Sequence, residues 1–120
     1  MQGLSCERLY VFESPIDCMS HASLVSEMTD NANAWKPHTR LSLAGTSDVG
    51  LFFFLSQQTQ VREIVFCLDN DTPGQSAAAF LAKKYSEKGY LTRIVPPKNK
   101  DFNEDLVDYR NETVNVRGAR

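Results

Sequence analysis

The sequence predicts an α/β fold, a three-layer sandwich in which helices cover both faces of a four-stranded parallel sheet. Four short apolar segments suited to buried strands alternate with four segments that carry helical start signals or helical periodicity. Such an alternation requires right-handed crossovers between parallel strands. The chain has 120 residues, which is room for one domain of ordinary size with a real hydrophobic core.

Each expected strand is a short run of aliphatic and aromatic residues, and the clearest is Ile64–Leu68. The four expected strands cover residues 9–12, 40–44, 64–68 and 91–95. Each expected helix follows a strand. The four expected helices cover residues 15–28, 51–58, 73–88 and 103–109.

Two helix starts have a clear chemical signal. Ser14 followed by Pro15, and Thr72 followed by Pro73, each offer an N-cap and a favourable first helical residue. The helix over 51–58 has a different signature, because three consecutive phenylalanines make it apolar on more than one side. We therefore expect that helix to be well buried.

The charge balance excludes a general attraction to nucleic acid or to anionic membranes, since 13 basic and 15 acidic residues give a net charge of −2. The distribution is uneven: residues 1–79 hold four basic and nine acidic side chains, and residues 80–120 hold nine basic and six acidic ones. This pattern is compatible with an acidic site beside a basic surface.

Purely apolar runs such as Leu51–Leu55 are short, far below the roughly 20 residues that span a bilayer. No signal peptide is visible in the first 20 residues. The three cysteines match no zinc pattern and are expected to be reduced thiols. We therefore expect a cytoplasmic protein without a membrane partner.

Acidic residues follow several of the expected strands. Glu13 ends the first strand, Asp69 and Asp71 follow the third, Asp101 follows the fourth, and Asp17 lies one helical turn after Glu13. Ligands bind beyond the carboxyl ends of strands in open parallel sheets. For these carboxylates to meet, the first and third strands must be adjacent, so we predict the strand order 2-1-3-4.

Carboxylates gathered in one cleft repel one another unless a cation joins them. Oxygen ligands suit Mg²⁺, with Mn²⁺ as an alternative. Gly74 would allow close backbone approach where the third helix begins, and a helix N-terminus attracts phosphate. The competing interpretation is that Asp69 and Asp71 only cap that helix and solvate a loop.

Basic and hydroxyl side chains near the expected site are candidates for contacting nucleic-acid phosphates. Lys98 and Lys100 lie on the loop after the fourth strand, and Thr46 follows the second strand. For Thr46, capping of the next helix is an equal explanation.

Four segments, taken in this order, resemble a Toprim domain, and together they cover about residues 8–110. They are residues 12–17, 43–46, 65–74 and 100–106, with the sequences FESPID, LAGT, VFCLDNDTPG and KDFNEDL. Toprim is the shared catalytic module of bacterial-type primases, type IA and type II topoisomerases, OLD-family nucleases and recombination-mediator proteins. The last segment looks most like the Toprim domains of primase-like proteins of plasmids, phages and conjugative elements.

The resemblance implies a Rossmann-like fold, a Mg²⁺ cofactor and roles for individual residues. Glu13 matches the family glutamate, which acts as general acid or base or as a metal ligand. Asp69 and Asp71 match the Asp-x-Asp pair that binds Mg²⁺, and Asp101 corresponds to a further acidic residue of some members. Asp17 is expected to support this group from just outside it.

The resemblance also implies partners and an organisation. We expect DNA or RNA and nucleotides as partners, and a nucleotidyl or phosphoryl transfer that is absent or weak in the isolated domain. Residues 1–110 are expected to form the domain and residues 111–120 a flexible tail, within a longer protein whose other domains are further partners. Ser14 stands where the family commonly has glycine.

Two alternatives remain open at this point. A non-catalytic Toprim-like module could bind nucleic acid or a partner without reacting. A haloacid-dehalogenase-type phosphatase has an Asp-x-Asp-x-Thr motif, which residues 69–72 imitate with the threonine one position earlier and with Asp69 as nucleophile. In that class the motif follows the first strand and needs a long downstream chain, and here two strand–helix units precede it.

Overall fold

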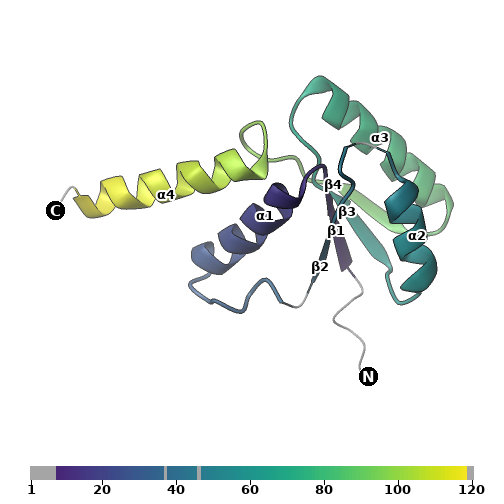
Figure 1. Ribbon diagram of the computed structural model, residues 1–120, viewed down its shortest axis with the longest axis horizontal. Helices are drawn as coiled ribbons and strands as arrows, with labels where there is room; N and C mark the ends of the chain where they lie inside the picture. Colours follow the sequence, from purple (N-terminus) through teal and green to yellow (C-terminus); the bar gives the residue numbers. More distant parts are fainter. Residues whose placement is uncertain (1–7, 37, 46, 119–120) are drawn as a thin grey trace.

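The computed structural model describes residues 8–36, 38–45 and 47–118. Strands and helices alternate along the chain as predicted (Figure 1). The strands are β1 (Arg8–Phe12), β2 (Thr39–Ser42), β3 (Glu63–Phe66) and β4 (Leu91–Ile94). The helices are α1 (Pro15–Met28), α2 (Val49–Gln57), α3 (Thr72–Glu87) and α4 (Phe102–Gly118).

The four strands form one parallel sheet with the order β2-β1-β3-β4, which confirms the predicted order 2-1-3-4. In the pairing of β1 with β3, Leu9 lies opposite Ile64 and Val11 lies opposite Phe66. The two central strands therefore end side by side, and the residues that follow them start from the same edge of the sheet.

The sheet separates two apolar cores, because successive side chains of a strand point to opposite faces. Ile64 and Phe66 of β3 pack against α2 and α3, together with buried residues such as Tyr85. Val65 and Cys67 point to the other face, in a core that includes Phe102 of α4. Figure 1 shows α1 and α4 on one side of the sheet and α2 and α3 on the other. The predicted three-layer arrangement is confirmed.

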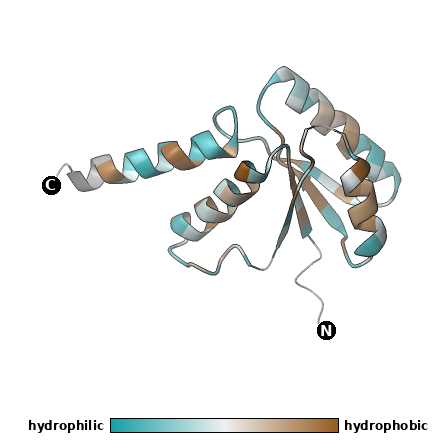
Figure 2. Cartoon of the chain, in the orientation of Figure 1, coloured by the Kyte–Doolittle hydropathy of each residue, from teal (hydrophilic) through white to brown (hydrophobic). Residues whose placement is uncertain are grey.

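Helix α2 is less buried than its composition predicts. Leu51 and Leu55 are buried, but Phe52 and Phe53 are 56% and 66% exposed. Adjacent helical residues point in directions about 100° apart, and α2 packs on the sheet with one side only. The expectation of a well-buried helix is therefore wrong for Phe52 and Phe53, and Figure 2 shows how hydrophobic this outer helix is.

This difference in burial predicts a difference in stability. Leu51→Ala is expected to lower the free energy of unfolding by about 2–4 kcal/mol, because it leaves a cavity in the core. Phe53→Ala is expected to change it by less than about 1 kcal/mol, since the ring is mostly in solvent. Urea unfolding followed by circular dichroism measures both. Equal losses would contradict the packing described for α2.

Helix α4 is longer than predicted. The sequence predicted a helix over 103–109 with a tail after it, whereas α4 begins at Phe102 and continues to Gly118. Beyond its buried start, the helix is held by α1: the Tyr109 hydroxyl donates to the backbone oxygen of Glu27 at 3.2 Å, and the Arg110 guanidinium pairs with the Glu27 carboxylate. The predicted helix end at residue 109 was therefore wrong. Polar contacts between distant segments hold the rest of the helix, and such contacts produce no apolar periodicity in the sequence.

The helices of the described residues include none with the length and apolar character needed to cross a bilayer. This agrees with the absence of any long apolar run in the sequence.

Candidate metal centre

Glu13 and Asp69 meet where the two central strands end. The backbone N–H of Asp69 donates a hydrogen bond to Oε2 of Glu13 at 2.9 Å. Just before this contact, the N–H of Cys67 donates to the backbone oxygen of Val11 at 2.8 Å, continuing the β1–β3 pairing. The adjacency of these strands thus brings a carboxylate from residue 13 against the loop that carries Asp69.

Gly74 closes the floor of this corner, in the first turn of α3. A Cβ atom at this position would lie 2.3 Å from the backbone oxygen of Asp69, 2.7 Å from Oε2 of Glu13 and 2.9 Å from Oδ1 of Asp71. These distances are far below van der Waals contact, so no larger residue fits without displacing backbone. The sequence predicted that Gly74 would allow another group to come close to the backbone, and the groups that do so are atoms of Glu13, Asp69 and Asp71.

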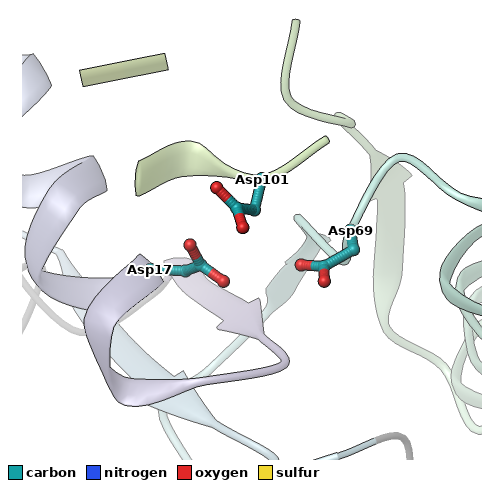
Figure 3. A group of neighbouring side chains, drawn as sticks. All are labelled: Asp17, Asp69 and Asp101. Carbon is teal, nitrogen blue, oxygen red and sulfur yellow. The ribbon is translucent and has the colours of Figure 1, made fainter. Parts of the chain in front are cut away.

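Three aspartates from separate elements point toward one space (Figure 3). Carboxylate oxygens of Asp17, Asp69 and Asp101 lie within 4.8 Å of one another. Asp17 comes from α1, Asp69 from the loop after β3, and Asp101 from the residue before α4. Three converging carboxylate oxygens are the donor set that hard divalent cations prefer, so the residues present fit a Mg²⁺ or Mn²⁺ ion.

Asp17 belongs to this group itself, although the sequence placed it outside. Its side chain is buried, with 3% exposure. The Ser14 hydroxyl donates to Oδ2 of Asp17 at 2.9 Å, and the backbone N–H of Asn103 donates to Oδ1 at 3.2 Å. The Ser-x-x-Asp spacing at the helix start was the available signal, because it resembles a capping box.

Ser14 does not need the conformational freedom of glycine. Its backbone is extended, with φ −134° and ψ 155°, a region open to any residue. Its hydroxyl caps α1, accepting from the N–H of Asp17, while it also orients the Asp17 carboxylate. The departure from the common family pattern therefore supplies a contact to a candidate ligand.

Asp101 is placed by the start of α4 and by a neighbouring loop. Its Oδ1 accepts a hydrogen bond from the N–H of Glu104 at 2.8 Å, the arrangement of an N-cap. The backbone oxygen of Lys100 accepts from the N–H of Asn70 at 2.6 Å. This bond ties the segment before α4 to the loop that carries Asp69.

Asp71 caps α3 rather than joining the three aspartates. It is the N-cap residue, and its Oδ1 accepts from the N–H of Gly74 at 2.8 Å. The sequence predicted Thr72 as the cap, and the structure moves the cap one residue earlier. Asp71 still lies beside Glu13 across Gly74, so its predicted part in metal binding remains a prediction.

Gln75 is a residue that the sequence did not single out. Its side-chain amide donates to the backbone oxygens of Leu68 at 3.3 Å and Asp69 at 3.0 Å. These two bonds hold the loop after β3 against the first turn of α3. A glutamine in a helix gives no local sign that it contacts a preceding loop.

The concentration of negative charge changes the acidity of the site. Partial burial, together with the nearby carboxylates of Glu13, Asp17, Asp101 and Asp71, raises the pKa of Asp69 to about 6. Burial also raises the pKa of Glu13, against the hydrogen bond from the Asp69 N–H, and the charge of Lys100 partly offsets the rise. A cation bound here would remove this repulsion.

The raised pKa of Asp69 predicts how the metal-free fold responds to pH. The folded carboxyl, with a pKa of about 6 against an ordinary 3.8, binds more protons than the unfolded one between these values, so stability falls as pH rises through this window. The expected loss is about 1–2 kcal/mol after allowing for solvent screening. Urea unfolding in EDTA measures it.

The comparison with Asp69→Asn isolates this effect. His21, whose pKa is lowered to about 4 mainly by burial, acts in the opposite direction, because it makes the fold lose stability as pH falls. Both proteins contain His21, so the difference between them reports Asp69. A wild type and variant with parallel pH profiles would contradict the assigned pKa.

The two basic candidates lie in different places: Lys100 is close enough to the site for its charge to act on Glu13, whereas Lys98 lines a groove between α1 and α4. Lys98 and Lys100 are exposed, and their backbone N–H groups donate to Asp105 and Glu104. Of these two lysines, only Lys100 is among the causes of the Glu13 pKa shift, and its charge lowers that pKa. Thr46, the remaining phosphate-binding candidate, lies outside the described residues.

Comparison with known proteins decides the family. A family model described as Toprim-like matches residues 10–106. The chain belongs to the Toprim-like family. Toprim domains typically bind divalent metal ions in nucleic-acid processing, and the three converging aspartates give this member a candidate place for one.

A relative from Mycoplasma pneumoniae (strain ATCC 29342 / M129 / Subtype 1) is 40% identical over 65 residues, and its name is "Uncharacterized protein MG010 homolog". The match covers 52% of this chain and 30% of the relative. The chain thus spans about a third of the length of this relative, and the relative's name states no activity.

Proposed function

We propose that this Toprim-like chain is the divalent-metal-dependent catalytic module of a primase-like, DNA-processing protein. The reaction would be a nucleotidyl or phosphoryl transfer on nucleic acid, absent or weak in the isolated domain. The observation that carries the proposal is the convergence of Asp17, Asp69 and Asp101 within 4.8 Å beside Glu13.

Asp17, Asp69 and Asp101 would hold a Mg²⁺ or Mn²⁺ ion, with Asp71 close by. When bound, the metal neutralises charge on phosphate oxygens, which phosphoryl transfer requires. The contacts from Ser14, Asn103 and Glu104 fix two of the three carboxylates before any ligand arrives. A preorganised donor set lowers the cost of binding.

Glu13 would move the proton of the reacting hydroxyl. Its Oε2 is engaged by the N–H of Asp69, and Oε1 forms no hydrogen bond within the described ranges. Burial raises the pKa of Glu13, which brings a carboxylate closer to the range suited to general acid or base chemistry at neutral pH.

The nucleic acid would approach over the loop after β4. Lys98 and Lys100 are exposed on this loop, and Lys100 acts on Glu13 through its charge, so the loop can offset the repulsion between carboxylates and a phosphate backbone. DNA or RNA and nucleotides are the expected substrates, in the cytoplasm and together with other domains of a longer protein.

Glu13→Gln separates proton transfer from metal binding. The amide keeps an oxygen for the N–H of Asp69, so Mn²⁺ affinity measured by calorimetry should stay within about threefold, while turnover falls by about 100-fold or more. Primer synthesis, nicking and plasmid relaxation assays with Mg²⁺, on this chain and within a longer protein that contains it, identify the reaction.

Two results would change the proposal. Metal binding by the wild-type chain with no reaction in any assay would make it a non-catalytic Toprim-like binding module. Full activity in Glu13→Gln would remove the proton-transfer role.

A further inference from the structure

Helices α1 and α4 pack against each other on the same side of the sheet (Figure 1), and a groove lies between them. This α1–α4 groove has a volume of about 510 Å³. Its lining includes five apolar or aromatic side chains. They are Leu24, Val25, Met28, Phe102 and Tyr109. The groove lies along the two helices, whereas the three aspartates of the metal centre gather where these helices begin.

The α4 side of the groove is acidic. Asp105, Asp108 and Glu112 line it and recur every three or four residues, so they share one stripe of the helix. Asp105 accepts hydrogen bonds from the N–H groups of Lys98 and Asn99 at 2.8 and 2.7 Å. Asp108 and Glu112 are exposed and have no hydrogen bond or ion pair to any described residue.

The paired charges of Asp108 and Glu112 are unfavourable in the free chain. Like charges four residues apart on a helix repel each other and destabilise the helix. Met28, on the facing side, is 66% exposed, which leaves a large apolar side chain in water. An occupant that covers Met28 and neutralises the two carboxylates would relieve both features.

We propose that the α1–α4 groove binds an amphipathic helix of a partner protein, with an apolar stripe on Met28 and the groove floor and Lys or Arg residues facing Asp108 and Glu112. Lys98 also lines the groove, but the carboxylates of Asp105, Asp108 and Glu112 outnumber it, so charge complementarity favours a basic partner over nucleic acid. The shape favours a helix, because an open groove along two helices can accept the side chains that project from one face of a third helix. The flexible side chain of Met28 can adapt to such a partner.

A model peptide tests this chemistry. The probe is a fluorescein-labelled peptide of about 18 residues, or about five helical turns, with leucines on one face and lysines elsewhere. The controls are a peptide of the same composition with leucines spread around the helix and a peptide with Glu in place of Lys. Fluorescence polarisation in Mg²⁺ buffer is expected to show the amphipathic basic peptide binding at least about tenfold more tightly than either control.

Two exposed methionines of α1 give a matched pair of variants. Met28 lines the groove and is 66% exposed, whereas Met19 lies outside it and is 69% exposed. Met28→Lys is expected to weaken peptide binding by about tenfold, and Met19→Lys by less than about twofold. Asp108→Asn with Glu112→Gln is expected to weaken binding and to reduce its dependence on salt. Amide shifts in NMR spectra should map to α1 and α4.

Several outcomes overturn the proposal. No binding, equal binding of the spread-leucine peptide, or equal effects of the two methionine variants would remove the groove as a helix site. Loss of binding in Asp69→Asn with Asp101→Asn would show that the lysines occupy the metal centre instead. Concentration-dependent dimerisation in sedimentation runs, abolished by Met28→Lys, would make a second copy the occupant.

Discussion

Asp69→Asn combined with Asp101→Asn is expected to weaken Mn²⁺ binding by roughly 100-fold or more. The two substitutions remove two of the three carboxylates whose oxygens lie within 4.8 Å of one another. An amide keeps the shape of the side chain but loses the charge that attracts a hard cation. Calorimetric titration with Mn²⁺ measures the affinity. The metal-free variant should be at least as stable as the wild type above pH 6, because burial and repulsion from neighbouring carboxylates both disfavour the charged form of Asp69.

Asp108→Asn with Glu112→Gln is the matched control for this experiment. It removes the same number of negative charges, but from exposed positions of α4 on the groove side of that helix. Its Mn²⁺ affinity should remain within about threefold of wild type, since charges in water are screened. If both double variants weaken Mn²⁺ binding equally, the affinity reflects net charge and the three aspartates are not a specific metal site.

Gly74→Ala is expected to lower the free energy of unfolding by about 2–3 kcal/mol. The added methyl group would lie 2.3 Å from the backbone oxygen of Asp69 and 2.7 Å from the Glu13 carboxylate. The first of these atoms is backbone and cannot move aside cheaply, so α3 must shift away from the loop after β3. The same shift would misplace Asp69, and we expect weaker Mn²⁺ binding in titrations beside the loss of stability in urea unfolding.

Gly50→Ala provides the opposite expectation in another helix. Gly50 lies in α2, and a Cβ atom there meets nothing within 4 Å. Alanine should therefore stabilise the fold by about 0.5–1 kcal/mol through the lower entropy of the unfolded chain. If Gly74→Ala were as benign as Gly50→Ala, the tight corner between Glu13, Asp69 and α3 would not exist in solution.

The sheet could be predicted from the sequence because local and global signals agree. The apolar run of β3 and the Ser14–Pro15 helix start are visible over a few residues. The strand order required one further argument, that carboxylates following the first and third strands should share one edge. That argument rests on the chemistry of the side chains and not on local propensities, and the observed strand order agrees with it.

The membership of the acidic group could be predicted only in part. Asp69 carries a recognisable Asp-x-Asp pattern, but the pattern does not say which of the two aspartates caps the helix. Asp17 and Asp101 enter the group through bonds between distant segments, such as the N–H of Asn103 on Asp17. A contact between segments so far apart in the chain leaves no local sequence pattern, so the sequence predicted a place for Asp17 outside the group.

The outer helices show the limit of composition as a guide to burial. The apolar composition of α2 predicts that at least one side of the helix is buried, but it does not predict how many sides pack against other elements. Phe53 remains mostly exposed to solvent. The extension of α4 past Tyr109 depends on Glu27 of α1. Its own residues are too polar to predict a helix from periodicity.

The hydrogen bond between Asn70 and Lys100 links the two loops that bring Asp69 and Asp101 together. During synthesis, residues 1–99 can emerge and pair their strands before this link exists, because Asp101 is made late. The acidic group is therefore completed only when the last strand–helix unit docks. The rate of Mn²⁺ binding during refolding would therefore report the rate of this final docking step.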